Sequence, residues 1–451
     1  MKPSTGRQQN SRSNRVLACF SRRGLGFLVC AVMISSSTLV LAQAGQLDST
    51  FGVGGIFTTS YTQSDATMDI AVAIQSDGKI VLGGSTPGGA ALARLNTNGT
   101  LDSTFGSGGI VNNTFGNILG VVVAVAIQLD GKIVAFAPGF AGGAVGRFNS
   151  DGSVDTTFGS SGFAVSRSLD SGPTTRSALA LQSDGKILVT GAGLIGRYTS
   201  TGQIDTTFGS AGLAPLTNSI ATAIALQSDG KILVATGFGS PTELFASPSL
   251  PFSQASAIAR YNTNGSPDTT FGISGQAACV ASAADIAIQS DGKIVVAGAI
   301  TSQLQIQGGL LNNRTGFGLV RYDSNGRVDT TFGKGGGVIT GFGSAFPAGS
   351  AFALAIQSNG EIVVAGQAGT VGGNSLGSAS FALARYTSAG KLDTTFGFNG
   401  TVTTAIGRGN ISFVGALTLQ SDGKIVAAGN YGPPSQGGFV DNFAVARYLA
   451  Q

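Results

Sequence analysis

The chain has no histidine, no tryptophan and only three cysteines in 451 residues, and charged residues make up 11% of it. Without histidine, most acid–base schemes, nucleophilic triads and zinc sites lose their usual member, so we predict no catalytic residue and no cofactor. Calcium needs only oxygen ligands and stays open as an alternative. Cys279 is the one cysteine after residue 30, which excludes an intrachain disulfide once a leader is removed.

Residues 1–44 predict such a leader, a signal peptide. They carry six basic and no acidic side chains, then the apolar stretch 25–42 and the small residues "AQA" at 42–44. The arginine pair in "SRRGLGF" also fits a loose twin-arginine signal, and an uncleaved anchor is the alternative. We therefore expect an exported protein, located in the periplasm, on the outer surface or outside the cell, and not held at a membrane after cleavage.

Charge changes with cleavage. The full chain has 26 basic and 22 acidic side chains, and the six basic ones of the leader leave 20 against 22. The remaining protein has no basic surplus, so nucleic acid is not an expected partner. We expect a monomer.

Glycine, in contrast, is abundant, with 71 residues, and it accompanies three motifs that each occur seven times in a fixed cyclic order. The first motif is "QSDGKI" at Gln75, Gln182, Gln227, Gln289 and Gln420, with the variants "QLDGKI" at Gln128 and "QSNGEI" at Gln357. An aspartate opens "DSTFG" or "DTTFG" at Asp48, Asp102, Asp155, Asp205, Asp268, Asp329 and Asp393. An arginine, usually in "AR" followed by Tyr, Phe or Leu, lies at Arg94, Arg147, Arg197, Arg260, Arg321, Arg385 and Arg447. A period of this length with strand-like elements indicates a propeller or an array.

One repeat predicts four strands. "DIAIQ" and "KIVVAG" are two strands joined by the tight turn "SDG", because Asp-Gly tolerates positive φ. "ALARLN" is predicted as the third strand and "TLDSTFG" as the fourth. Seven such units predict an all-β fold over residues 45–451, a seven-bladed β-propeller with four antiparallel strands per blade. The Asp-Gly-Lys stretch is thus a hairpin turn, and not a phosphate-binding loop, which would lead into a helix.

These motifs resemble the bacterial delta-60 repeat family, and the resemblance covers essentially all of residues 46–449. It implies a propeller of an exported protein and brings no established activity with it. The rhythm of "AIQSDGKIVVAG" followed by "ARY" is also similar to blades of NHL-type propellers.

Each arginine precedes an aspartate by eight positions, except at the ends of the chain. A three-residue hairpin loop would place Arg94 opposite Asp102, and we interpret the seven pairs as structural. Asp48 has no arginine before it, and Arg447 has no aspartate after it. We therefore predict that the strand of Asp48 completes the seventh blade beside Arg447 and closes the ring.

Function is predicted at the rim that carries the connection between second and third strands. Counted from the turn Lys or Glu to the Arg, this connection spans 11 to 15 positions in blades one to three and 23 to 29 in blades four to seven. Loops on a rigid scaffold commonly bind ligands. The candidate binding residues are Phe245, Phe252, Asn312, Asn313, Arg314, Tyr431 and Asp441.

The favoured function is a non-enzymatic binding or structural module whose partner is an extracellular polymer, glycan or protein. Mobile loops without function are the alternative for the long connections. A second alternative is a propeller enzyme of lyase or lactonase type, with carboxylates and calcium at the central channel. Blade-specific polar residues near the inner strands are Asp65, Asp69, Asn117 and Asp285. Residues 323–329, "DSNGRVD", look like part of a calcium loop, although a plain turn is favoured because its counterparts vary at the ligand positions.

Overall fold

The computed structural model has two units, residues 1–42 and residues 43–451. In the first, only the paired strands β1 (Val16–Leu17) and β2 (Val32–Met33) are described. Residues 43 and 44, the last two of the predicted signal peptide, are described as part of the second unit, and the rest of the predicted signal peptide lies outside the described residues. In the second, the structure describes residues 43–59, 70–86, 88–112, 115, 120–139, 142–169, 177–191, 193–216, 220–236, 256–279, 282–300, 316–343, 348–372, 375–407, 409–433 and 442–451.

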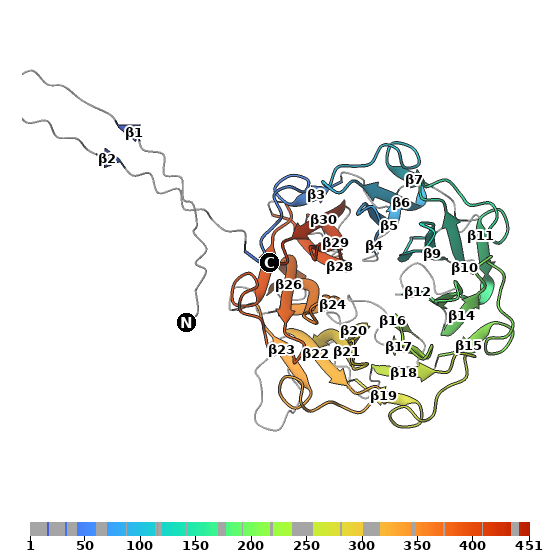
Figure 1. Ribbon diagram of the computed structural model, residues 1–451. Coiled ribbons are helices and arrows are strands. Elements are labelled where there is room, and N and C mark those ends of the chain that lie inside the picture. The colour runs from blue at the N-terminus through green and yellow to red at the C-terminus, as the bar shows by residue number, and fades with distance from the viewer. Residues whose placement is uncertain are drawn as a thin grey trace, which may run out of the picture. The chain divides into compact units, whose positions relative to one another are not determined.

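The second unit consists of seven four-stranded antiparallel sheets arranged in a ring, as the sequence predicted (Figure 1). The first, innermost strands are β4 (Ala71–Ile74), β8 (Ala124–Ile127), β12 (Leu179–Leu181), β16 (Ala221–Leu226), β20 (Ser282–Ile288), β24 (Ala348–Ile356) and β28 (Ile411–Leu419). The second strands are β5 (Ile80–Thr86), β9 (Ile133–Gly139), β13 (Ile187–Gly191), β17 (Ile232–Thr236), β21 (Ile294–Ile300), β25 (Ile362–Gly372) and β29 (Ile425–Gly432).

The outer half of each blade follows the same order. The third strands are β6 (Gly89–Leu95), β10 (Gly142–Phe148), β14 (Leu194–Tyr198), β18 (Ala257–Tyr261), β22 (Gly316–Tyr322), β26 (Ser375–Tyr386) and β30 (Asn442–Tyr448). The fourth strands are β7 (Ile110–Asn112), β11 (Phe163–Ser166), β15 (Leu213–Pro215), β19 (Gln276–Ala278), β23 (Gly337–Thr340), β27 (Thr401–Thr404) and β3 (Ile56–Thr58). A short 3-10 helix, η2 (Arg167–Leu169), follows β11.

The Asp-Gly-Lys stretch forms the predicted hairpin turn. In blade one, the backbone N–H of Gln75 donates to the carbonyl of Lys79 at 2.9 Å, and Gly78 has φ 82°. The side chain of Asp77 accepts the N–H of Lys79 at 3.1 Å. Both strands that flank this turn have continuous apolar sequences, and every residue of β5 is buried, because neighbouring blades cover both of its faces.

The ring closes through the two ends of the propeller, which confirms the closure prediction. Strand β3, near the start of this unit, pairs antiparallel with β30, near its end, with Phe57 opposite Val445. The two segments lie side by side as blue and red strands of one blade in Figure 1. Each innermost strand also contacts the innermost strand of the next blade, and β28 contacts β4 to complete the circle.

One element differs from the prediction. "TLDSTFG" is not the fourth strand but a series of tight turns, and β7 begins only at Ile110. The reason is local: the Asp102 side chain accepts the N–H of Thr104 at 3.1 Å and its hydroxyl at 2.7 Å, and such side-chain bonds compete with a strand ladder. Gly106 and Gly109, at φ 53° and 99°, then turn the chain back into β7.

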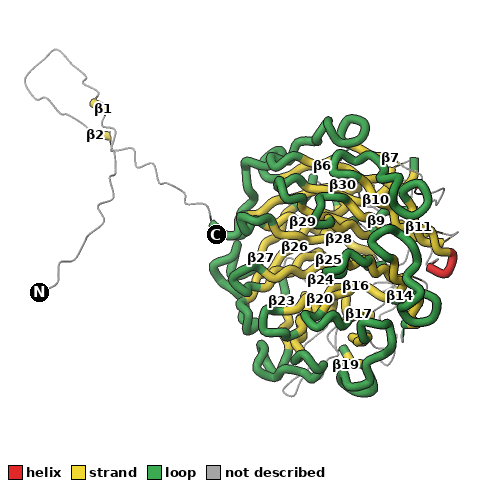
Figure 2. Tube along the Cα trace, turned by 45° about the vertical axis from the view of Figure 1, so that its right-hand side comes forward, coloured by secondary structure: helices red, strands yellow, loops and turns green. Residues whose placement is uncertain are grey.

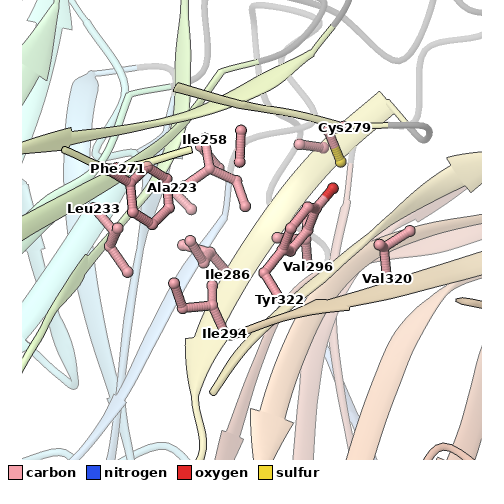
Figure 3. Close-up of a cluster of buried hydrophobic side chains, with 13 residues drawn as sticks. Ala223, Leu233, Ile258, Phe271, Cys279, Ile286, Ile294, Val296, Val320 and Tyr322 are labelled. Atoms are coloured by element: carbon pink, nitrogen blue, oxygen red, sulfur yellow. The ribbon is translucent and has the colours of Figure 1, made fainter. Parts of the chain in front are cut away.

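The hydrophobic core lies between neighbouring blades. Figure 3 shows one such cluster, in which Leu233, Ile258 and Phe271 of blade four meet Ile294 and Tyr322 of blade five. Loops and turns cover the ends of the strands, while η2 is the helical segment drawn in Figure 2. In the residues that the structure describes, no helix has the length and apolar character needed to cross a membrane.

Candidate functional site

The propeller has two rims with different chemistry. We call "uniform rim" the one formed by the turns between first and second strands, such as 75–79, and the turns that follow the third strands, such as 96–100. We call "variable rim" the one formed by the connections between second and third strands and by the linkers from one blade to the next. Because consecutive strands are antiparallel, each kind of connection stays on its own rim in all seven blades.

Near the uniform rim, each repeated arginine contacts the aspartate that the spacing predicted. In blade one, Arg94 Nε donates to Asp102 Oδ2 at 2.8 Å, and both side chains are buried. The guanidinium carbon also lies 4.6 Å from the centre of the Phe105 ring. An Arg–Asp contact of 2.7 to 2.9 Å recurs, through Nη2 at Arg321 and through Nε at the others, in the pairs Arg147–Asp155, Arg197–Asp205, Arg260–Asp268, Arg321–Asp329, Arg385–Asp393 and Arg447–Asp48.

The same arginines also join each blade to the next, which sequence reasoning missed. Arg260 Nη1 donates to the carbonyl of Ser324 in the following blade at 2.7 Å, and Arg147 does so to Ser200 at 2.6 Å. Arg447 continues the series across the closure, where its Nη1 donates to the carbonyl of Thr97 in blade one. The acceptors are backbone atoms, so no residue type in the sequence signals these links.

The lysines of the uniform rim contact the same aspartates. Lys79 Nζ lies 3.0 Å from Asp102 Oδ2, and its counterparts in blades two to five and seven lie 2.7 to 3.8 Å from theirs. Blade six has Glu361 in place of the lysine, and there Arg385 Nη1 lies 3.3 Å from Glu361 Oε2 as well. The turn lysines and Glu361 of this rim therefore contact the Arg–Asp pairs.

Burial alone raises the pKa of these carboxyls, but hydrogen bonds and nearby cations outweigh it. The hydroxyl of Thr104, the ammonium of Lys79 and the charge of Arg94 hold the pKa of Asp102 well below its usual range. In blade five the Thr331 hydroxyl is the largest influence, and the pKa of Asp329 falls to about 2. These carboxyls stay ionised at neutral pH, which suits anchors for arginine better than proton donors.

The innermost strands of all seven blades line a central cavity of about 230 Å³. Asp285 is the one charged side chain among the described residues that line it. It follows a β-bulge in β20, its Oδ1 accepts the N–H of Ile286 at 2.8 Å, and its Oδ2 accepts the N–H of Leu354 at 2.7 Å. Asp285 thereby links blade five to blade six. Asp65, Asp69 and Asn117 lie outside the described residues.

The acidic loop that resembles a calcium site also uses its oxygens internally. Asp323 Oδ1 accepts the backbone N–H groups of Asn325 and Arg327, each at 2.9 Å. Over the described ranges, no group of three or more His, Cys, Asp or Glu side chains is arranged to hold a metal ion.

The variable rim holds the candidate binding residues, of which the structure describes Tyr431. It lies in β29 and is half-buried, and its hydroxyl donates to the carbonyl of Thr59 at 3.0 Å. The others lie outside the described residues: Phe245, Phe252, Asn312, Asn313, Arg314 and Asp441.

The connection of blade six differs from the expected loop. Residues 368–380 largely continue β25 and β26 as a paired hairpin, in which Thr370 lies opposite Ser378 and Gly372 opposite Ser375. These two strands have 11 and 12 residues, whereas the second and third strands of blade three have five each. Sequence reasoning missed this extension because small residues and glycines are typical of loops as well.

Six stretches of the chain match a family described as "Domain of unknown function (DUF5122) beta-propeller". They are residues 75–105, 128–158, 182–208, 252–271, 289–332 and 357–396. The chain is a β-propeller repeat protein. Most of the matched stretches run from the glutamine of a hairpin turn to the phenylalanine of "DSTFG" or "DTTFG", so they contain the Arg–Asp pairs described above. The delta-60 name stays a prediction.

Among solved structures, the chain is similar to virginiamycin B lyase from Staphylococcus aureus, with 12% identity and a TM-score of 0.51, over 87% of this chain and 99% of the other. It is also similar to the extracellular domain of a protein assigned to a hybrid two component system of B. thetaiotaomicron (13% identity, TM-score 0.48, 87% and 41% covered). A gluconolactonase from Xanthomonas campestris is a third (12%, 0.36, 87% and 89%). At 12% identity the likeness to the lyase shows the fold alone. No curated protein matches the chain.

Proposed function

We propose that this protein is an exported, non-catalytic binding module that holds an extracellular polymer, glycan or protein on its variable rim. The observation that supports this most is the contrast between the rims. The uniform rim repeats the Arg–Asp contact in seven blades, with a lysine beside it in six of them, whereas the variable rim differs from blade to blade. A surface that discriminates one ligand from others needs such differences.

Blades four to seven supply the proposed contacts. Their connections carry aromatic, amide and charged groups that the shorter connections of blades one to three mostly lack, and aromatic anchors with surrounding hydrogen-bonding groups are typical of binding surfaces. The proposed contact residues are Phe245, Phe252, Asn312, Asn313, Arg314, Tyr431 and Asp441. The extended hairpin of β25 and β26 lies in the corresponding connection of blade six and supports including that blade in the proposed surface.

Catalysis in the channel is the weaker proposal. A lyase or lactonase mechanism with metal and carboxylates needs oxygens directed at a substrate. Both carboxylate oxygens of Asp285 instead accept backbone N–H groups, one of them from the neighbouring blade. This arrangement supports a structural role for Asp285.

The test begins with a glycan array and a pull-down from envelope and matrix material. With a ligand in hand, residues 240–255 and 302–315 are each shortened to the length of the blade-three connection, and we expect binding to be lost while the melting temperature stays within a few degrees. The matched control is Lys79→Gln, Lys132→Gln and Lys186→Gln on the uniform rim, which should leave the dissociation constant unchanged. Loss of binding in the lysine variants with retention in the shortened ones would refute the proposal.

A further inference from the structure

The residue after each repeated arginine bridges two blades in the second half of the ring. The hydroxyl of Tyr386 in blade six donates to Thr340 Oγ1 of blade five at 2.7 Å, and that of Tyr448 donates to Thr404 Oγ1 of blade six at 2.9 Å. Tyr261 and Tyr322 do the same with backbone carbonyls of the preceding blade, at 3.1 and 2.9 Å. Figure 3 shows the Tyr322 side chain within the core that blades four and five share, and its hydroxyl oxygen points towards Cys279.

Blade one has Leu95 at this position. The interface between blades seven and one therefore has no tyrosine side chain there. The acceptor is nevertheless in place. Thr340 and Thr404 lie opposite the phenylalanines four residues before Arg321 and Arg385. Thr59 lies beside Phe443, four residues before Arg447, and its N–H donates to the carbonyl of Phe443 at 3.0 Å.

A cavity of about 240 Å³ lies at this interface, between blades seven and one. Its walls are largely apolar and include Phe57 and Phe443 from blade seven and Leu82, Leu101 and Ile110 from blade one. The polar lining residues are Thr58, Thr59, Ser85 and Thr86.

Ala93, two residues before Leu95 on the same face of β6, lines this cavity and is half-buried. Its counterparts in the other six blades are all buried: Gly146, Gly196, Ala259, Val320, Ala384 and Ala446. The space beside this position is therefore open in blade one and filled elsewhere.

We propose that the closure cavity is a binding site for a small phenol. The aromatic ring would lie against the apolar walls, and the hydroxyl would form a hydrogen bond with Thr59, as the tyrosine hydroxyls do with Thr340 and Thr404. The volume is sufficient, since an apolar cavity of roughly 150 Å³ binds benzene. This site adjoins one of the variable-rim contacts proposed above, because the carbonyl of Thr59 accepts the hydroxyl of Tyr431 at 3.0 Å. The argument for it does not rest on that proposal.

The probe is p-cresol, which is the side chain of tyrosine. We expect it to raise the melting temperature of the full-length protein in a saturable manner, by about 1–2 °C, and toluene to raise it less because it has no hydroxyl. Leu95→Tyr should raise the melting temperature without ligand and abolish the response to p-cresol. Blade five has Val320 at the position of Ala93, and Ala93→Val should therefore narrow the cavity and weaken the response to p-cresol several-fold. This second variant tests the proposal even if Leu95→Tyr does not fold.

Tyr386→Leu is the matched control at another interface. It should lower the melting temperature, and p-cresol should then restore part of the loss. The proposal would be overturned if p-cresol left the melting temperature of the wild-type protein unchanged and Ala93→Val destabilised the protein. Those two results would mean that the protein chain already fills the cavity. Equal responses to toluene and p-cresol would overturn the assignment to phenols.

Discussion

Replacing one arginine of the uniform rim by alanine tests whether the repeated network stabilises the ring. Arg260 is 5% exposed, its Nε lies 2.8 Å from Asp268 Oδ2, and its guanidinium lies 4.7 Å from the centre of the Phe271 ring. Arg260→Ala removes these contacts and the link to Ser324 of the next blade. Breaking a buried ion pair costs about 3–5 kcal/mol. Because Lys231 stays 2.9 Å from Asp268, we expect the lower end of that range.

Blade six provides a matched comparison in the same molecule. Arg385 is buried and contacts both Asp393 and Glu361, and the hairpin turn has no lysine to take its place. Arg385→Ala therefore leaves two carboxylates without their arginine, and we expect the upper end of the range, about 5 kcal/mol. Adding Glu361→Lys to that variant should recover part of the loss, because it restores the cation that the other blades have.

The assay is the melting temperature together with the urea midpoint at pH 7, for the wild-type protein and the three variants. The expected order of stability is wild type, Arg260→Ala, the double variant and Arg385→Ala. Losses below about 0.5 kcal/mol in both single variants would mean that the pairs behave as surface ion pairs. Equal losses in blades four and six would refute the role assigned to the turn lysine.

Two further predictions concern the whole ring. Deleting residues 46–59 removes Asp48 and β3 and leaves the edge of β30 unpaired. We therefore expect a sharp fall in melting temperature, and aggregation measured by light scattering. An unchanged melting temperature would contradict the view that ring closure stabilises the fold. The chain has no histidine, and the pKa values of Asp48, Asp102, Asp155, Asp205, Asp268, Asp329 and Asp393 are lowered in the folded state. Their stabilisation is present above the unfolded pKa of about 3.9 and is lost as pH falls towards the folded values. Urea midpoints should thus be level from pH 5 to 8 and fall below pH 4; a level profile down to pH 2 would contradict this.

The sequence was sufficient for the fold because its information is repeated. Seven hairpin turns and an invariant eight-residue spacing predicted four-stranded blades, and the unmatched Asp48 and Arg447 predicted the closure. The fourth strand was misplaced because "DSTFG" is rich in threonine and phenylalanine, which favour strands. Asp102 and the glycines that follow it decide the local structure instead. The links between blades were not predictable, since Arg260 and its counterparts bind backbone carbonyls.

In a repeat protein, comparing the blades distinguishes the positions that build the scaffold from those that can form a binding site. The sequence alone allows this comparison only in part. Positions that are alike in seven blades, such as Arg94 and its counterparts, have the same neighbours seven times and explain why the ring forms. Positions at which one blade departs from the rest change a local environment that the others keep constant. Leu95 is such a departure, because the other six blades have an aromatic residue there. The cavity at the same interface joins Ala93 of blade one to Thr59, which lies across the closure beside blade seven. The variable connections of blades four to seven are the larger case of the same rule, and that is why both proposals lie where the repeats differ.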